Sequence, residues 1–284
     1  MVSGFAILSV WYLLCGPTLG WGDVGHRTVA YLAEHYLTER ATWADEIKRK
    51  HPETKPWHYV DVEDDPLGNI CNISSLPQDC KSAKSCIISA IEDMTVQVND
   101  DSFNQTEAVM FLFHFFGDLD MPLHVEDYEK GGNKILVCFD GHKDNLHSIW
   151  DTDMAHKING IKHRLKHNDK KVAPLKWAKH LLQKNKHRPM TAVECADVIN
   201  TRTCVKQLAE ETNRLNCAVV FKRWLPYLNG EDLAGDTMTM PCRSLRNKSL
   251  KQVCVRLATW INAIAEKSRA KTAFVVQGDR MRDL

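Results

Sequence analysis

The stretch HFFGDLDMPLH, residues 114–124, places two histidines and two aspartates inside an otherwise apolar segment. His114 and Asp118 are four residues apart, so they share one face of a helix. Pro122 ends that helix, and His124 follows in the next turn. Imidazole and carboxylate groups are costly to bury without a partner. The stretch therefore predicts a helix that carries metal ligands and stops where the chain turns to offer another.

The same spacing occurs again in HSIWD, which holds His147 and Asp151. Further candidates are scattered along the chain at His26, Asp45, His58 and Asp61. A single histidine of this kind is more often a core residue with ordinary hydrogen bonds. Taken jointly, the residues would leave unpaired charge on an apolar helix unless a metal bound them. Imidazole and carboxylate are the ligands that Zn²⁺ accepts at about 2.0–2.2 Å, so the pattern predicts a zinc site.

Composition limits the possible partners. The 284 residues are 44% hydrophobic, which is enough for a good-sized core. Lysine and arginine number 37 against 36 acidic residues, a net charge of +1. Such a balance gives no global attraction to a DNA duplex or an anionic membrane. A polyanionic substrate would have to be held locally, by metal or by a few placed cations.

Helical periodicity dominates the chain. It is found at residues 24–37, 85–98, 106–119, 145–158, 174–185, 204–225 and 255–268. The one strand signal is NKILVCF, residues 133–139, which follows two glycines and ends at the turn pair Asp140-Gly141. No repeat or low-complexity linker interrupts this pattern. We therefore expect an all-α fold, a single multi-helix domain with a short β-hairpin.

The first twenty residues predict a signal peptide. Residues 1–20 contain no charged side chain, and the apolar run from Phe5 to Leu14 is too short for a membrane span. Thr18 and Gly20 are small residues at the positions that a signal peptidase reads. Cleavage after Gly20 would make Trp21 the mature N-terminus. The alternatives are an N-terminal anchor or a buried helix.

Other features also favour secretion. Nine of the ten cysteines follow the signal, as expected in an oxidising compartment. Asn72 and Asn104 begin Asn-x-Ser/Thr glycosylation acceptors. No second hydrophobic run is long enough to cross a bilayer. Residues 269–284 read as a loosely attached C-terminal tail.

Several motifs together resemble one family. They are WGDVGHRTVAYLAEHYL, WADEI, WHYVDVEDDP, FHFFGDLDMPLH, GGNKILVCFDG and DNLHSIWDT. They resemble the zinc-dependent type I nucleases secreted by fungi and plants, which cleave single-stranded nucleic acids and remove 3′-phosphates from nucleotides. That family is similar in fold to bacterial zinc phospholipase C. The resemblance covers residues 21–268 and implies a monomeric zinc nuclease domain acting on single-stranded RNA or DNA and 3′-nucleotides.

The resemblance implies three zinc ions. The first would be held by Asp45, His58, His114 and Asp118. The second would be held by His124, His147 and Asp151. The third would be held by His26, the shared carboxylate of Asp118, and the free amine and carbonyl of Trp21. That amine exists only if the signal is removed before Trp21, so activity would depend on processing.

The resemblance also implies roles around the metals. Water activated by zinc would attack phosphorus, oriented by Asp45, and the products would carry 5′-phosphates. Tyr59 would stack on a base, while Asp61 and Asn133 would hydrogen-bond its edge. An unpaired base can enter such a site, whereas a base in a duplex is already stacked and paired.

The family pattern further implies disulfides between Cys71 and Cys217 and between Cys80 and Cys86. Pairing of Cys195 with Cys204 is left open.

Three departures from the family pattern raise alternatives. Lys48 stands where the family usually has arginine, so the charge is kept but the planar fork is lost. Only 19 residues separate His26 from Asp45, about 20 fewer than usual, which predicts a strained, helix-free path to Asp45. Residues 237–254 lack a helical stripe and read as a shifted frame. An inactive zinc-binding product and a zinc phospholipase C are therefore the alternative hypotheses.

Overall fold

The computed structural model describes residues 43–74, 80, 85–161, 169–184, 195–224, 232–234, 253 and 256–268. Several predictions lie outside these ranges: the signal peptide 1–20, Trp21, His26, the helix at 24–37, the tail 269–284, and residues 237–254 apart from Val253.

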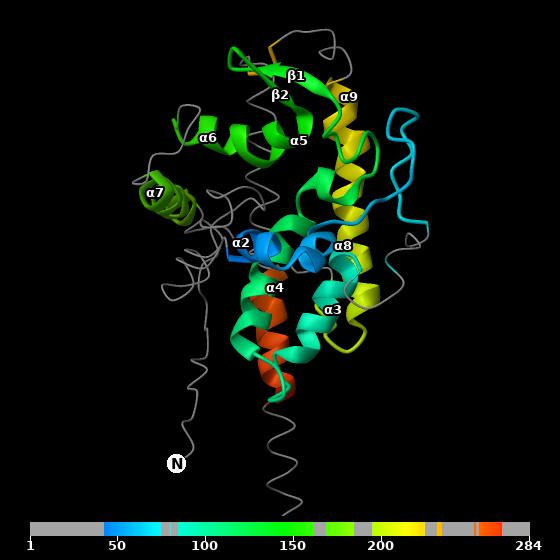
Figure 1. Cartoon of the computed structure of the whole chain (residues 1–284), viewed down its shortest axis with the longest axis vertical. Helices are drawn as coiled ribbons and strands as arrows, with labels where there is room; N and C mark the ends of the chain where they lie inside the picture. Colours follow the sequence, from blue (N-terminus) through cyan, green and yellow to red (C-terminus); the bar gives the residue numbers. More distant parts are fainter. Residues whose placement is uncertain are drawn as a thin grey trace, which may run out of the picture.

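The described chain is mostly helical, as the periodicity predicted (Figure 1). Its elements are α2 (Trp43–Lys50), η1 (Pro52–His58), α3 (Ile87–Gln97), α4 (Gln105–Leu119), η3 (Pro122–Val125), β1 (Leu136–Phe139), β2 (His142–Asn145), α5 (Leu146–Ser148), η4 (Ile149–Asp153), α6 (Met154–Ile158), α7 (Asp169–Lys184), α8 (Thr201–Leu215), η5 (Asn216–Val220) and α9 (Phe221–Trp224). Residues 256–268 form a further helical segment. Among these described helices none is long and apolar enough to span a bilayer.

The larger core lies where α3, α4, α8 and the helical segment 256–268 pack together (Figure 1). Leu112, Phe115, Leu208 and Trp260 are fully buried there. Burying side chains of this size stabilises the fold by about 1.5–3 kcal/mol each. Since Leu112 and Phe115 lie on α4, the core fixes that helix and with it the face that carries His114 and Asp118.

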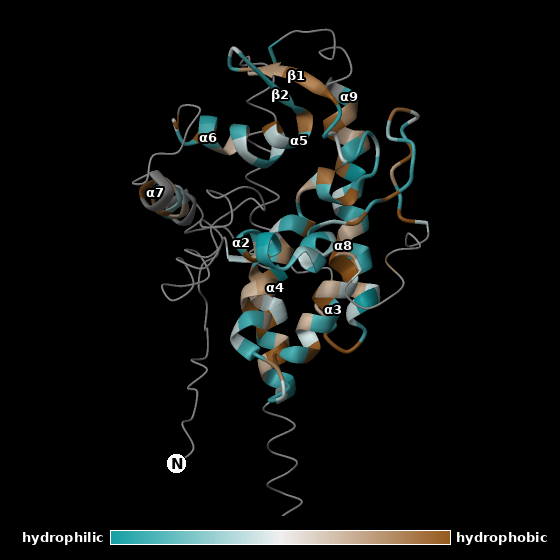
Figure 2. Ribbon diagram, viewed as in Figure 1, coloured by the Kyte–Doolittle hydropathy of each residue, from teal (hydrophilic) through white to brown (hydrophobic). Residues whose placement is uncertain are grey.

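The predicted strand and turn are confirmed. β1 pairs antiparallel with β2, and the register joins Leu136 to Asn145. Asp140 and Gly141 both have positive φ, 53° and 79°, which is the conformation of a tight two-residue hairpin turn. β1 is apolar and β2 polar (Figure 2). The hairpin contributes to a second core cluster that also contains Trp150 and Trp177.

Two of the predicted helices are interrupted by π-turns. The segment predicted at 145–158 is built from α5, the π-turn η4 and α6, and the segment at 204–225 contains the π-turn η5. A π-turn inserts one residue into the helical repeat, and such turns are frequent at functional sites. Asp151 lies within η4, so the irregularity falls on a predicted ligand.

The last residues before Asp45 differ from the predicted helix-free path. Within the described residues, which begin at Trp43 in this region, the chain is helical, and α2 includes Asp45 in its first turn. Ala44 is buried in the larger core, and Trp43 makes an edge contact with Phe111 of α4 at 5.0 Å between ring centroids. This packing provides the stabilisation that a strained, helix-free segment at Asp45 would lack.

Three disulfides link the described part of the chain. They join Cys71 to Cys217, Cys80 to Cys86, and Cys195 to Cys204. The first two are the pairs that the resemblance implied, and the third is the pair that the sequence left open. The bond from Cys71 to Cys217 closes a sequence separation of 146 residues and ties the loop after η1 to η5.

Candidate active site

Helix α4 positions the first two candidate ligands. The side chain of Asn104 caps the helix by accepting a hydrogen bond from the Glu107 amide at 3.3 Å. His114 and Asp118 are each only 1% exposed. Their Nε2 and Oδ2 atoms lie 3.1 Å apart, as the spacing of four residues predicted. After Asp118 the helix ends, and η3 carries the chain to His124.

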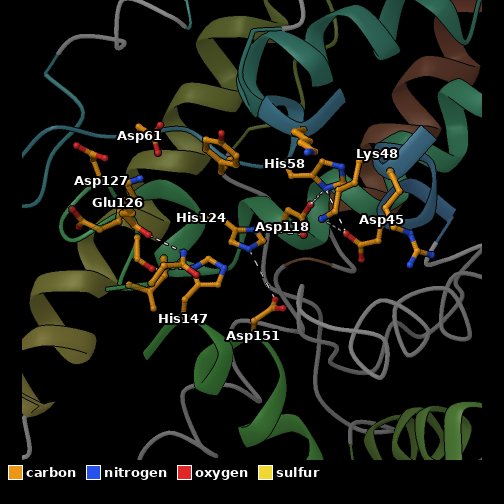
Figure 3. Close-up of a pocket in the computed structure, with 17 residues that line it drawn as sticks. Asp45, Lys48, His58, Asp61, Asp118, His124, Glu126, Asp127, His147 and Asp151 are labelled. Carbon is orange, nitrogen blue, oxygen red and sulfur yellow. Dashed lines mark hydrogen bonds and ion pairs between the residues drawn. The ribbon is translucent and has the colours of Figure 1, made fainter. Parts of the chain in front are cut away.

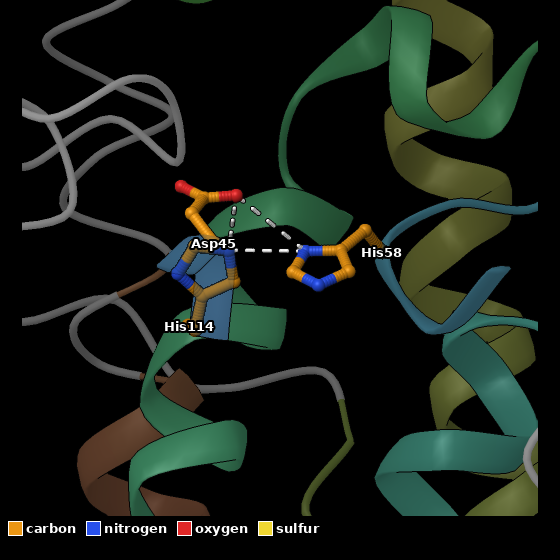
Figure 4. A group of neighbouring side chains, drawn as sticks. All are labelled: Asp45, His58 and His114. Atoms are coloured by element: carbon orange, nitrogen blue, oxygen red, sulfur yellow. Dashed lines mark hydrogen bonds and ion pairs between the residues drawn. The ribbon is translucent and has the colours of Figure 1, made fainter. Parts of the chain in front are cut away.

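Donor atoms of Asp45, His58 and His114 converge at one end of the site (Figure 4). The carboxylate of Asp118 adjoins the two histidines. Nδ1 of His58 lies 2.9 Å from Oδ2 of Asp118 and 3.1 Å from Nε2 of His114. Oδ1 of Asp45 lies 3.6 Å from the same His114 nitrogen and 4.0 Å from the His58 nitrogen. Tetrahedral zinc ligands at about 2.0–2.1 Å from the metal are about 3.3 Å from one another. The spacing and chemistry of these donors therefore fit a zinc ion.

The protonation states of two of these donors, Asp118 and His58, fit a cation. Burial alone would raise the pKa of the Asp118 carboxyl, but the charges of His114 and His124 hold it well below its usual value. Burial lowers the pKa of the His58 imidazole to about 4, although its hydrogen bond with Asp118 acts in the opposite direction. At neutral pH Asp118 is ionised and His58 is neutral, as metal ligands must be.

A second group of donors adjoins the first. Nδ1 of His124 lies 3.4 Å from Oδ1 of Asp118, and its Nε2 lies 4.0 Å from Oδ1 of Asp151. The rings of His124 and His147 stack with centroids 5.1 Å apart. Burial and the neighbouring His124 lower the pKa of His147. Because Asp118 faces both groups, one carboxylate joins the two candidate metal positions.

An unusual turn orients His147. Its Nδ1–H donates to the carbonyl oxygen of Gly131 at 2.8 Å, which leaves Nε2 as the available donor to a metal. Four consecutive residues, 129–132, have positive φ. A side chain at Gly131 would approach the Leu123 carbonyl oxygen to 2.5 Å, so only glycine fits. This left-handed turn is the reason that the sequence needs two glycines beside the hairpin.

These groups open onto a cavity of about 640 Å³ (Figure 3). Asp61 lies at the end of the cavity away from Asp45 (Figure 3). Tyr59 lines the cavity on the same extended segment, whose alternate residues Val60 and Val62 are buried. The Val60 amide donates to the His124 carbonyl oxygen at 2.8 Å, which fixes this segment against the metal-binding end. The alternation turns Tyr59 and Asp61 toward the cavity.

Comparison with known proteins places this site in a family. The sequence profile of the S1/P1 nucleases matches residues 35–266. The chain belongs to the S1/P1 nuclease family. It is therefore an enzyme of the nuclease class, and the nucleases of this family are metal-dependent.

Relatives of this S1/P1 nuclease occur in fungi and plants. Nuclease P1 of Penicillium citrinum is 35% identical over 283 residues, covering 88% of this chain and 100% of the relative. Nuclease S1 of Aspergillus oryzae is 31% identical, covering 88% of this chain and 93% of the relative. Endonuclease 4 of Arabidopsis thaliana is 32% identical, covering 92% and 94%.

Most residues that the sequence predicted for the nuclease site lie together. Those lining the one cavity are Asp45, Lys48, His58, Tyr59, Asp61, Asp118, His124, Asn133, His147 and Asp151. His114 contacts this set from the core side through Asp118. Asn133 lines the cavity while its amide also donates to the Lys130 carbonyl oxygen at 2.8 Å. Trp21 and His26 lie outside the described residues.

Other residues of the site carried no signal in the sequence. They differ in this from Lys48, which was predicted and whose ammonium group lies 2.7 Å from Oδ1 of Asp45. Arg49, Lys55 and Lys130 also line the cavity and lie in polar stretches of the sequence. Nothing in their local pattern separates them from ordinary surface residues. Their position depends on how α2, η1 and the left-handed turn meet.

Glu126 is another lining residue that the sequence did not single out. It is 2% exposed, and its Oε1 accepts a hydrogen bond from the Tyr128 amide at 2.9 Å. Burial, with Asp64 nearby, raises the pKa of Glu126 to about 8. Burial also raises the pKa of Asp64. The nearby Cys71 is disulfide-bonded, so this carboxyl pair has no thiolate with which to bind a metal.

Proposed function

We propose that this chain is a secreted, zinc-dependent endonuclease that hydrolyses single-stranded RNA and DNA to 5′-phosphate products and also acts as a 3′-nucleotidase. The observation that carries the proposal is the cavity itself. One end gathers the carboxylates and imidazoles of Asp45, His58, Asp118 and His124, and Tyr59 and Asp61 line the same cavity. A phosphate held at the carboxylates and imidazoles and a base stacked on Tyr59 together match a nucleotide.

Three zinc ions would be held by this chain's residues. The first position would use Asp45, His58, His114 and Asp118, and the second would use His124, His147 and Asp151. The third would use Asp118 together with His26 and the amine and carbonyl of Trp21, for which the support is the family resemblance. When bound, zinc supplies Lewis acidity that polarises phosphoryl oxygens and lowers the pKa of water.

The surrounding side chains would position the substrate. Asp45 has one carboxylate oxygen toward Lys48 and lies on the partly exposed side of the first donor group, where it can accept a proton from an attacking water. Lys48 would neutralise charge on the phosphate. Tyr59 would stack on a base, at about 1–3 kcal/mol, with Asp61 and Asn133 at the base edge. Since stacking requires an exposed base face, the site favours single strands.

Secretion and the 3′-nucleotidase activity rest on different support. The uncharged leader at 1–20 and the disulfides favour an oxidising, extracellular location. Removal of a terminal 3′-phosphate needs the same base site and the same metal-bound phosphate position as chain cleavage, so one cavity serves both reactions. The chain would act as a monomer, with glycosylation at Asn72 and Asn104, both of which are exposed.

One experiment separates the proposal from its alternatives. The processed chain, with Trp21 confirmed as its first residue, would be analysed for zinc by mass spectrometry and assayed on single-stranded RNA, single-stranded DNA, a 3′-nucleotide and phosphatidylcholine. We expect three zinc ions per chain and turnover of the first three substrates. Fewer zinc ions with no turnover would identify an inactive binding product, and turnover of the lipid alone would identify a phospholipase.

A further inference from the structure

The nearly neutral net charge conceals a strongly basic segment. Residues 157–188 contain eleven lysines and arginines and one acidic residue, Asp169. The whole chain has 37 basic and 36 acidic residues, so the remainder carries 26 basic and 35 acidic residues. Cations concentrated in one stretch create a local potential that attracts polyanions even when the total charge is close to zero.

Helix α7 lies in the middle of this segment and packs against the elements that carry part of the active site. Trp177 and Ala178 of α7 are buried at 4% and 2% exposure. Trp177 belongs to the core cluster that contains Ile149, Trp150 and Met154, the residues around Asp151. Figure 1 shows α7 beside α6, the continuation of that element. The helix is therefore fixed against the element that supplies a predicted zinc ligand.

The opposite face of α7 presents free cations. Lys176 and Lys179 are exposed and three residues apart, so they lie on one face of the helix. Within the described part of the chain neither lysine forms an ion pair or a side-chain hydrogen bond. No carboxylate among the described residues neutralises these two charges, so they are available to a partner.

We propose that the face of α7 formed by Lys176 and Lys179 binds backbone phosphates of a single-stranded polynucleotide whose reacting nucleotide occupies the cavity. This inference rests on the proposed nuclease function and adds a second contact surface for the polymer. A polynucleotide is the ligand that these charges complement, and α7 packs against the element that carries Asp151. Val172 is the one apolar residue exposed on this face among those described, which gives a membrane little to bury.

Geometry sets the length of strand that can use this surface. The outer face of α7 is about two helix diameters, roughly 20 Å, from Asp151. An unpaired strand is not held at the roughly 3.4 Å rise of a duplex and spans up to about twice that per nucleotide, so it reaches this face after about three to six nucleotides. A dinucleotide therefore fills the cavity without reaching α7, whereas a strand of about twenty nucleotides contacts both.

The test is the double variant Lys176→Gln, Lys179→Gln. Its matched control is Lys222→Gln, Lys267→Gln, which removes the same charge from exposed positions that do not line the cavity. The zinc-loaded proteins would be compared for KM on a long strand, a dinucleotide and a 3′-mononucleotide over a range of salt. Anisotropy of a labelled long strand, with each protein also carrying His124→Ala so that the strand is not cleaved, would measure binding without turnover.

Each phosphate contact on a single strand steepens the log–log dependence of binding on salt by about 0.7. We expect the α7 double variant to bind the long strand with a slope shallower by about 1.4 and, at 0.1 M salt, about tenfold more weakly. Its kinetics on the dinucleotide and the mononucleotide should match the wild type, and the control should match the wild type on every substrate.

Two results would overturn the inference: equal behaviour of the α7 variant and its control, or an equal loss on the mononucleotide. Failure of the nuclease proposal is separable. It would appear as absent turnover in the wild type, while anisotropy would still report whether α7 contributes to strand binding.

Discussion

Oδ1 of Asp118 lies 3.4 Å from Nδ1 of His124, while Oδ2 of the same carboxylate lies 2.9 Å from Nδ1 of His58. One buried side chain thus joins the two donor groups of the site. Its pKa is held well below the ordinary value by the surrounding histidines, although burial opposes this. The carboxylate is therefore the point at which loss of one charge disturbs both groups.

Replacement of Asp118 should lower the zinc content per chain more than replacement of a ligand that contacts a single metal position. We expect Asp118→Asn to lose the zinc ions of the first and third positions, which its carboxylate would help to hold, and to lower kcat by about a thousandfold or more, since a metal supplies several kcal/mol of charge stabilisation. His124→Ala should lose one zinc and also abolish turnover. Zinc content by mass spectrometry and kcat on single-stranded RNA measure both effects. Asp101→Asn, at an exposed position, is the control, and full zinc content with normal turnover in Asp118→Asn would contradict the assignment.

Tyr59 should act through its ring and not through its hydroxyl. It is 38% exposed at the edge of the cavity, where a base can stack on it. We expect Tyr59→Ala to raise KM about 5- to 100-fold, from a stacking energy of about 1–3 kcal/mol, and Tyr59→Phe to keep the wild-type KM. Steady-state kinetics on a 3′-nucleotide provide the measurement. An equal effect of both substitutions would assign the role to the hydroxyl.

Lys48 should tolerate arginine but not alanine. Its ammonium group lies 2.7 Å from Asp45, and Asp45 raises its pKa although burial acts to lower it. We expect Lys48→Ala to reduce kcat/KM about 10- to 100-fold, and Lys48→Arg to retain activity because its planar fork can hold a phosphate. Lys50→Ala, on the same helix but outside the cavity lining, is the matched control. Unchanged kcat/KM in Lys48→Ala would exclude a role at the phosphate.

Glu126 should make the stability depend on pH. Its pKa rises from 4.5 to about 8 on folding, because of burial and the nearby Asp64. Its proton is therefore retained by the folded chain and lost by the unfolded chain between these values, so this contribution to stability is complete below pH 4.5 and is lost as the pH rises to 8. The glutamine variant does not lose this contribution. When the pH is raised from 5 to 8, we therefore expect the free energy of unfolding of Glu126→Gln to increase relative to that of the wild type by on the order of 2 kcal/mol.

Urea unfolding of the zinc-loaded protein at the two pH values measures this difference, and comparison at each pH cancels the pH dependence of zinc binding. Glu266→Gln, at an exposed position, should show no such gain. Parallel stability profiles for the wild type and Glu126→Gln would show that Glu126 is ionised in the folded protein.

Chelation should remove activity and part of the stability together. A ligand that binds only the folded state at a hundred times its Kd stabilises it by about 2.7 kcal/mol. For a chain of this size we expect EDTA to lower Tm by about 5–10 °C for each zinc lost, and zinc addition to restore both Tm and turnover. Differential scanning calorimetry with a parallel activity assay tests this. A fully active protein after complete removal of metal would exclude zinc from the mechanism.

The sequence by itself determined the helices and the chemistry of the ligands, because both depend on short-range spacing. Apolar residues at helical intervals located α3, α4 and α8, and residues four apart put His114 beside Asp118 and His147 close to Asp151. The Asp140-Gly141 pair located the hairpin, since a two-residue turn needs positive φ at both positions.

Only the tertiary structure decided which of these residues meet. Asp45, His58 and Asp118 come from three elements, and their distances depend on how α2 and η1 pack against α4. The start of α2 at Trp43, the two π-turns and the burial of Glu126 likewise had no local signal. Each results from contacts between residues distant in the chain, and the free energy of such contacts is set by the assembled core and not by the neighbouring sequence.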